Sequence, residues 1–107
     1  MEGIHDGDGG IAVRPFFRGL TRSGINLHVW ELPPGTSEGR HTHAEDDPDD
    51  AYEEIYLVLD GRGTLHVEGE DVPLETGDAV LVPVNVDHGL SASRDVALRI
   101  AIVFALI

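Results

Sequence analysis

The C-terminal stretch VALRIAIVFALI, residues 96–107, is the feature that most limits the fold of this chain. A period of two places alternate side chains on opposite faces of a strand, so the stretch predicts a β-strand buried on one face. At twelve residues it is shorter than a membrane span, which needs about 20. The apolar face consists of Val96, Leu98, Ile100, Ile102, Phe104 and Leu106.

Short strands and turns account for the rest of the chain. Residues 11–17 predict an edge strand, because a proline interrupts them, and residues 25–32 predict a second strand. Residues 54–70 predict a hairpin that turns at Asp60-Gly61-Arg62-Gly63, and Thr76-Gly77-Asp78 predicts a further turn before another strand. Helical periodicity is missing, so we expect an all-β sandwich or barrel.

Length and charge narrow the possible functions. The 107 residues suit one domain, which we place at 11–107 after a flexible lead at 1–10. The chain has no cysteine, which excludes thiolate chemistry, and its net charge of −13 argues against nucleic acid and membrane as partners. The N-terminal residues lack a signal-peptide pattern, so we expect a cytoplasmic protein.

The segment HTHAEDDPDDAYEE, residues 41–54, contains the candidate metal ligands. His41 and His43 would share one face of a strand and converge on one ion, provided that further ligands come from elsewhere. Glu54 begins an apolar strand, and if it faces inward then Tyr56 and Val58 do too. The remaining acids predict a solvated loop, residues 45–53, that includes Glu45, Asp46, Asp47, Asp49 and Asp50.

Two ordered motifs resemble those of the cupin superfamily. The first combines GTSEGRHTH with EIYLVLDG, and the second is GDAVLVPVNVDH. Together they cover residues 35–88, and the resemblance is to small single-domain cupins of the conserved-barrel type.

This resemblance implies a double-stranded β-helix, or jelly-roll barrel, around one divalent transition metal ion (Fe, Mn, Ni, Zn or Cu). The motifs would supply His41, His43, Glu54 and His88 as ligands, leaving about two positions of an octahedral ion open.

The chain departs from the family pattern at three places. Ten residues separate His43 from Glu54, more than is usual, so Asp47 is a rival ligand. We prefer Glu54, since it keeps the six-residue spacing to Gly61 and a loop insertion costs little. Asn85 stands where glycine is usual, and Ala92 stands where asparagine is usual.

Several other residues have two interpretations. His28 and His66 either line the barrel near the metal or occupy ordinary polar positions on strands. Trp30 suits the core better than a substrate platform. Arg99 either binds an anion inside the barrel or pairs with an acid at an edge. We select Tyr56 and His66 as catalytic candidates for proton transfer.

Two classes of function fit these residues. One is a metal-dependent enzyme, of dioxygenase or isomerase type, acting on a small polar molecule. The alternative is a non-catalytic, metal-stabilised barrel that binds a small ligand or acts as a sensor. In both cases we expect a homodimer, because the terminal strands offer sheet edges to cover.

Overall fold

The computed structural model describes residues 7, 9–47 and 51–106. Within these residues the regular structure is entirely β, and no helix is present that is long and apolar enough to cross a membrane. The strands are β1 (Ala12–Phe16), β2 (Ile25–Leu32), β3 (Ser37–His41), β4 (Tyr52–Val67), β5 (Glu70–Glu75), β6 (Ala79–Val82), β7 (His88–Ala92) and β8 (Leu98–Leu106).

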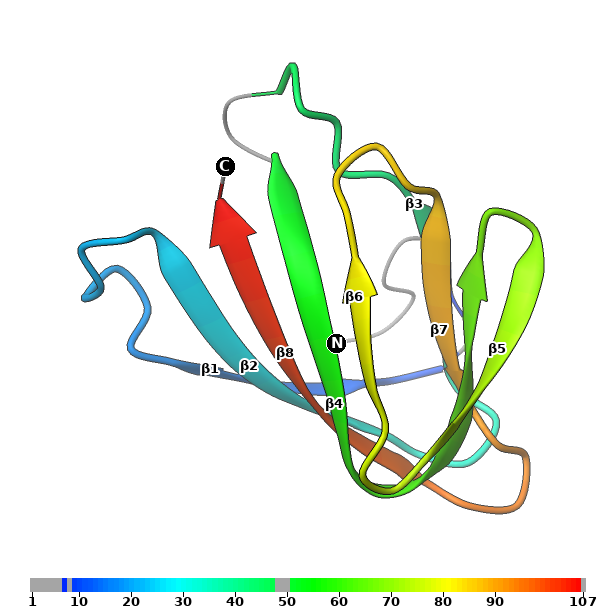
Figure 1. The fold of residues 1–107 in the computed structure, drawn as a ribbon. Helices are drawn as coiled ribbons and strands as arrows, with labels where there is room; N and C mark the ends of the chain where they lie inside the picture. Colours follow the sequence, from blue (N-terminus) through cyan, green and yellow to red (C-terminus); the bar gives the residue numbers. More distant parts are fainter. Residues whose placement is uncertain (1–6, 8, 48–50, 107) are drawn as a thin grey trace.

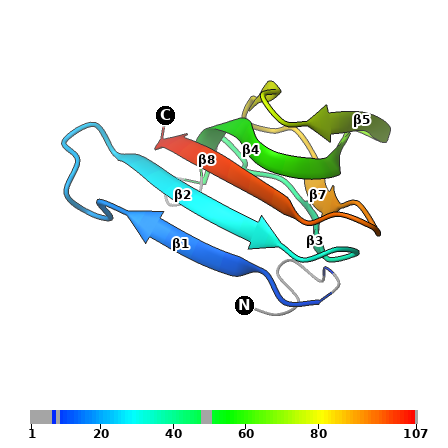
Figure 2. The same ribbon diagram turned by 90° about the horizontal axis from the view of Figure 1, so that it is seen from below.

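The strands curl into two antiparallel layers that face each other and share β4 (Figure 1). The first half of β4 pairs with β8 and β6, whereas its second half pairs with β5 and β7. β2 extends the first layer beyond β8, and β1 lies next to β2 (Figure 2). β3 extends the second layer beyond β7. This arrangement confirms the predicted all-β barrel.

Alternation along the strands places the core between the two layers. Leu98, Ile100 and Ile102 of β8 are fully buried, as the C-terminal pattern predicts. β2 has the predicted bounds, and β1 pairs only with β2 among the described strands, so its proline lies on an edge as expected. The N-terminal lead predicted at residues 1–10 falls largely outside the described residues.

The turn predicted at residues 60–63 is wrong, because these residues lie inside β4. The tight turn comes later, at Glu68 and Gly69, which both have positive φ. Gly61 instead serves a bend in β4: its φ is +90°, and a Cβ there would lie 1.8 Å from the carbonyl oxygen of Ala97. The glycines that suggested a turn therefore let one strand pass from one layer to the other.

An extra residue in β4 accompanies this bend and reverses its alternation. Val58 pairs with Ile100 while Asp60 pairs with Arg99, so Leu59 is an additional residue on the β4 side. Before this bulge the even-numbered side chains of β4 point into the barrel, and after it the odd-numbered ones do.

Replacing Gly61 by alanine tests the bend. We expect Gly61→Ala to lower the free energy of unfolding by about 3 kcal/mol, through positive-φ strain combined with the steric clash. Gly77→Ala is the matched control, because Gly77 has φ +92° but open space around its Cβ position. It should cost only about 1 kcal/mol. Urea denaturation measures both values, and equal losses would contradict the close-approach explanation.

Candidate metal site

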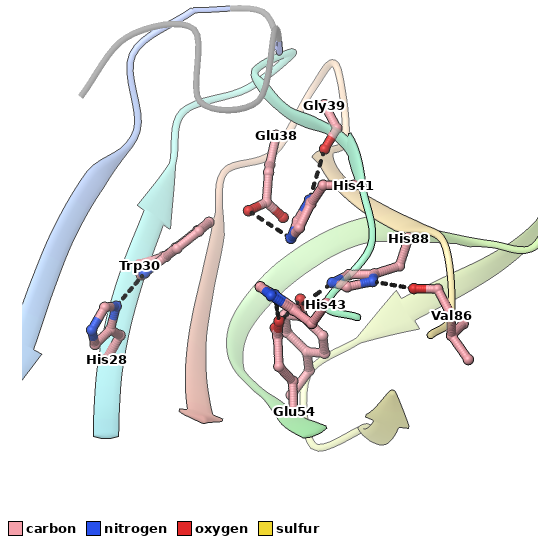
Figure 3. A network of polar contacts seen from close by, with 10 residues as sticks. His28, Trp30, Glu38, Gly39, His41, His43, Glu54, Val86 and His88 are labelled. Carbon is pink, nitrogen blue, oxygen red and sulfur yellow. Dashed lines mark hydrogen bonds and ion pairs between the residues drawn. The ribbon is translucent and has the colours of Figure 1, made fainter. Parts of the chain in front are cut away.

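Three histidines and one glutamate meet inside the barrel. His41, His43, Glu54 and His88 each offer a ligand atom, and these atoms all lie within 4.8 Å of one another. His43, Glu54 and His88 are buried, and the His41 side chain is 12% exposed. The structure thus brings together all four residues that the cupin motifs indicate, in a cluster that can hold a metal ion (Figure 3).

Three strands and one loop position these side chains. His41 ends β3 and pairs with His88, which begins β7. Glu54 lies in the first half of β4, and its side chain points into the barrel. The expectation that both motif histidines lie on a strand is only partly correct, because β3 ends at His41 and His43 follows it.

Asn85 holds the segment that carries His43. Its backbone N–H donates to the carbonyl oxygen of His43 (2.7 Å), and its side-chain oxygen accepts from the backbone N–H of Glu45 (2.9 Å). Asn85 has φ +65°, a conformation that asparagine tolerates better than most residues. Asparagine in place of the usual glycine therefore preserves the turn and adds a side-chain contact.

Hydrogen bonds to the backbone orient two of the imidazoles. Nδ1 of His88 donates to the carbonyl oxygen of Val86 (2.8 Å), and Nδ1 of His41 donates to that of Gly39 (3.1 Å). In a neutral ring this leaves Nε2 without a proton and able to bind a metal. Nε2 of His88 lies 3.4 Å from Oε1 of Glu54.

Glu54 is an ionised carboxylate in a buried position. Burial raises its pKa, but contacts with His43, His88 and the Tyr56 hydroxyl outweigh burial and lower the pKa from 4.5 to about 2. The hydroxyl of Tyr56 donates to Oε2 of Glu54 (2.5 Å). Burial, together with the charge of Glu54, raises the pKa of Tyr56 well above 10.0, so this hydroxyl keeps its proton.

The donor set fits a divalent transition metal. Within the described part of the chain, Oε1 of Glu54 and Nε2 of His88 are buried and form no hydrogen bond of acceptable geometry. Buried polar atoms normally have partners, and a metal ion held by Glu54 and His88 would provide one. Imidazole and carboxylate ligands suit Fe, Mn, Ni, Zn and Cu.

The structure separates the rival and accessory candidates from this cluster. Asp47 is exposed, as are Glu45 and Asp46, whereas Asp49 and Asp50 lie outside the described residues. His66 follows the bulge in β4, on the face opposite the buried Leu65. There its ring contacts Asp71 (2.5 Å) and Ser91 (3.1 Å).

The three remaining candidates lie in different parts of the molecule: Trp30 in the core, His28 at a cavity and Arg99 on the surface. Trp30 is buried in the core, as predicted, and its indole N–H donates to Nδ1 of His28 (3.1 Å). His28 lines a cavity that His43 also lines. Arg99 pairs with the acid Glu31 (3.3 Å) on the outer surface, as one of its two interpretations expects, but it does so on β8, an interior strand between β2 and β4, and not at a sheet edge.

Glu38 is a functional candidate that the sequence did not reveal. It is 5% exposed, and its Oε2 lies 3.9 Å from Nε2 of His41 (Figure 3). A register shift between Glu38 and His41 turns both side chains inward, although a spacing of three would normally place them on opposite faces. Burial, aided by the charge of Glu54, raises the pKa of Glu38 to about 8.

Comparison with known proteins places this site in a family context. The family model described as "Cupin domain" matches residues 28–104. An oxalate-binding protein of Thermotoga maritima is 32% identical over 77 residues, which make up 72% of this chain and 59% of that protein. An uncharacterised protein of Streptomyces coelicolor is 30% identical over 80% of this chain and 74% of its own length.

Solved structures agree with the fold. A predicted oxalate decarboxylase of Thermotoga maritima matches all of this chain and 90% of its own, with a TM-score of 0.86 and 25% identity. A cupin protein of Bacteroides fragilis matches 89% of this chain and 76% of its own, with a TM-score of 0.76 and 24% identity.

Glu38 predicts a specific pH dependence in chelator-treated protein. Its pKa is about 8 when folded, against an ordinary value of 4.5, so the folded state binds the proton more tightly. This contribution to stability is complete below pH 4.5 and is lost as pH rises through 8. Between pH 4.5 and pH 7 the free energy of unfolding of the wild type therefore falls by about 3 kcal/mol through Glu38. The Glu38→Gln variant does not show this decrease.

Urea denaturation between pH 5 and pH 8 checks this difference. Glu53→Gln is the control, because Glu53 is an exposed residue of β4. Glu54 does not interfere, since its lowered pKa affects stability only below pH 4.5. The same pH dependence in the wild type and in Glu38→Gln would contradict the prediction.

Proposed function

The chain belongs to the cupin domain family, and we propose that it holds one divalent transition metal ion and binds a small oxygen-donor molecule through that ion. The ligands are His41, His43, Glu54 and His88. The observation that carries this proposal is the convergence of four donor atoms within 4.8 Å in a site where a carboxylate stays ionised although it is buried.

Four protein ligands leave about two positions of an octahedral ion for water or substrate. When bound, the ion supplies Lewis-acid or oxygen chemistry. The protein's own residues orient the ligands: the hydroxyl of Tyr56 fixes the Glu54 carboxylate, and backbone carbonyls fix the rings of His41 and His88. We therefore assign Tyr56 a positioning role ahead of the proton-transfer role considered for it from the sequence.

An enzyme of the dioxygenase or isomerase type is the first candidate, and a non-catalytic ligand-binding or sensor barrel is the alternative. A cavity that shares His43 with the metal cluster supports both candidates, because a small molecule there has access to the ion. Among the two catalytic candidates, Tyr56 contacts the cluster, whereas the contacts of His66 with Asp71 and Ser91 give it no direct part in this site.

The named relatives suggest the first ligand to test. One is an oxalate-binding protein and another is a predicted oxalate decarboxylase. Because this chain spans 59% of the oxalate-binding protein, oxalate is for this chain only a proposed ligand. Its carboxylate oxygens are ligands of the kind that such an ion binds.

Metal content tests the site. We expect plasma mass spectrometry to find nearly one Fe, Mn, Ni, Zn or Cu per chain in the wild type, and less than a tenth of that in the His41→Ala/His88→Ala double variant. His66→Ala is the control, because it removes a histidine that contacts Asp71 and Ser91 instead of the cluster. No uptake after reconstitution with any of the five metals, or equal uptake by the double variant, would refute the proposal.

We also propose that the protein is a homodimer formed through the outer face of the first layer. Ile55, Leu57 and Leu81 are 46%, 41% and 57% exposed on that face, and Ile55 pairs with both Leu81 and Val103. Contiguous apolar surface of this kind marks an interaction site.

Location in the cytoplasm, and the absence of nucleic acid and membrane partners, stay predictions from the sequence.

Light scattering at micromolar concentration tests the dimer. We expect twice the mass of one chain for the wild type and a monomer for Ile55→Asp/Leu81→Asp, because burying two carboxylates in an apolar interface is costly. Leu20→Asp, at a residue that is 78% exposed in the β1–β2 loop, should remain dimeric. A monomeric wild type would end this proposal.

A further inference from the structure

A cavity of about 260 Å³ lies beside the metal cluster. The even-numbered residues of β2, β4 and β8 line it from inside the barrel, the β1–β2 loop adds Arg18, and His43 belongs to both the cavity and the cluster. A molecule in the cavity is therefore next to the ion site. The lining residues are Arg18, Asn26, His28, His43, Tyr52 and Phe104.

The cavity lining carries a positive charge, whereas the chain as a whole is strongly acidic. The chain has 20 acids and only 7 arginines, yet the lining holds one arginine and no acid. Arg18 forms no ion pair within residues 7, 9–47 and 51–106, so its guanidinium is available to an anion. A planar guanidinium can bind a carboxylate through two parallel hydrogen bonds.

His28 adds a hydrogen-bond donor of fixed orientation. The indole of Trp30 donates to Nδ1 of His28, so the neutral ring carries its proton on Nε2 (Figure 3). The ring of Phe104 packs against it edge-on, with centroids 4.8 Å apart. Burial and the charge of Arg18 lower the pKa of His28, which keeps the ring neutral. His28 thus offers an N–H group and does not act as a base.

We propose that this cavity selects a small carboxylic acid that carries a second oxygen donor, such as a hydroxy, oxo or dicarboxylic acid. Its carboxylate binds Arg18 and the Nε2–H of His28, while its other oxygen faces the ion site at His43. The cavity, at about 260 Å³, is slightly smaller than the usual range for ligand sites, roughly 300–1,000 Å³, so the acid has few carbon atoms. The proposal rests on the proposed metal site and names Arg18 as the residue that determines specificity.

Calorimetric titration of manganese-loaded protein tests this selectivity, because Mn²⁺ takes octahedral coordination and keeps positions open beside four protein ligands. Malonate is the probe, and malonamide is its neutral counterpart. We expect malonate to bind at least about tenfold more tightly than malonamide, and Arg18→Gln to weaken malonate binding by about tenfold or more. Arg18→Lys should restore part of the affinity. Arg22→Gln is the matched control, because Arg22 is an exposed arginine of the same loop outside the cavity lining, and it should bind like the wild type.

The possible outcomes separate the two proposals. Equal binding of malonate and malonamide, wild-type affinity in Arg18→Gln, or tighter binding of inorganic phosphate than of malonate overturns the carboxylic-acid assignment while leaving the metal site intact. If the chain takes up no metal, the metal-site proposal is refuted, and the same titrations on metal-free protein test the cavity alone. Malonate binding that depends on Arg18 then supports the anion-binding cavity. The absence of such binding overturns the cavity proposal as well.

Discussion

A buried, ionised carboxylate surrounded by imidazoles is the interaction on which the rest of this structure depends. Placing the charge of Glu54 inside a barrel costs several kcal/mol unless good partners offset the loss of water. The nearby Tyr56 hydroxyl donates to this carboxylate, and a cation held by Glu54 together with His43 and His88, which come from other parts of the chain, would supply the remaining compensation. The strands must close into a barrel for these groups to meet, so the cluster and the fold stabilise each other.

The bend in β4 explains how one strand serves both layers. Before the bulge the strand directs Glu54, Tyr56 and Val58 into the barrel, and after it Leu65 points inward in their place. A strand of constant alternation would turn either the site or the second half of the core toward solvent. Gly61 makes the change of layer possible, since no other residue fits so close to the backbone of Ala97 without strain.

The residues of the candidate metal cluster could be predicted from the sequence, but the residues and turns around the cluster could not. His41, His43, Glu54 and His88 could be selected because the two motifs resemble those of cupins, although the interval between His43 and Glu54 is longer than usual. The hairpin at residues 60–63 was wrong because glycine permits both a turn and a close backbone approach. Glu38 was missed because a register shift, invisible in the sequence, brings it to the same side as His41.

By itself the sequence determined an all-β chain and its buried C-terminal strand, because alternation is a local property, and its resemblance to the cupin motifs indicated the three histidines and the glutamate of the candidate metal site. Only the tertiary structure decided which neighbours each side chain meets. It placed His66 on an outer face and paired Arg99 with Glu31, and it joined Arg18 and His28 in one cavity beside the cluster. Those outcomes depend on bulges, bends and strand pairing, which act between segments far apart in the chain.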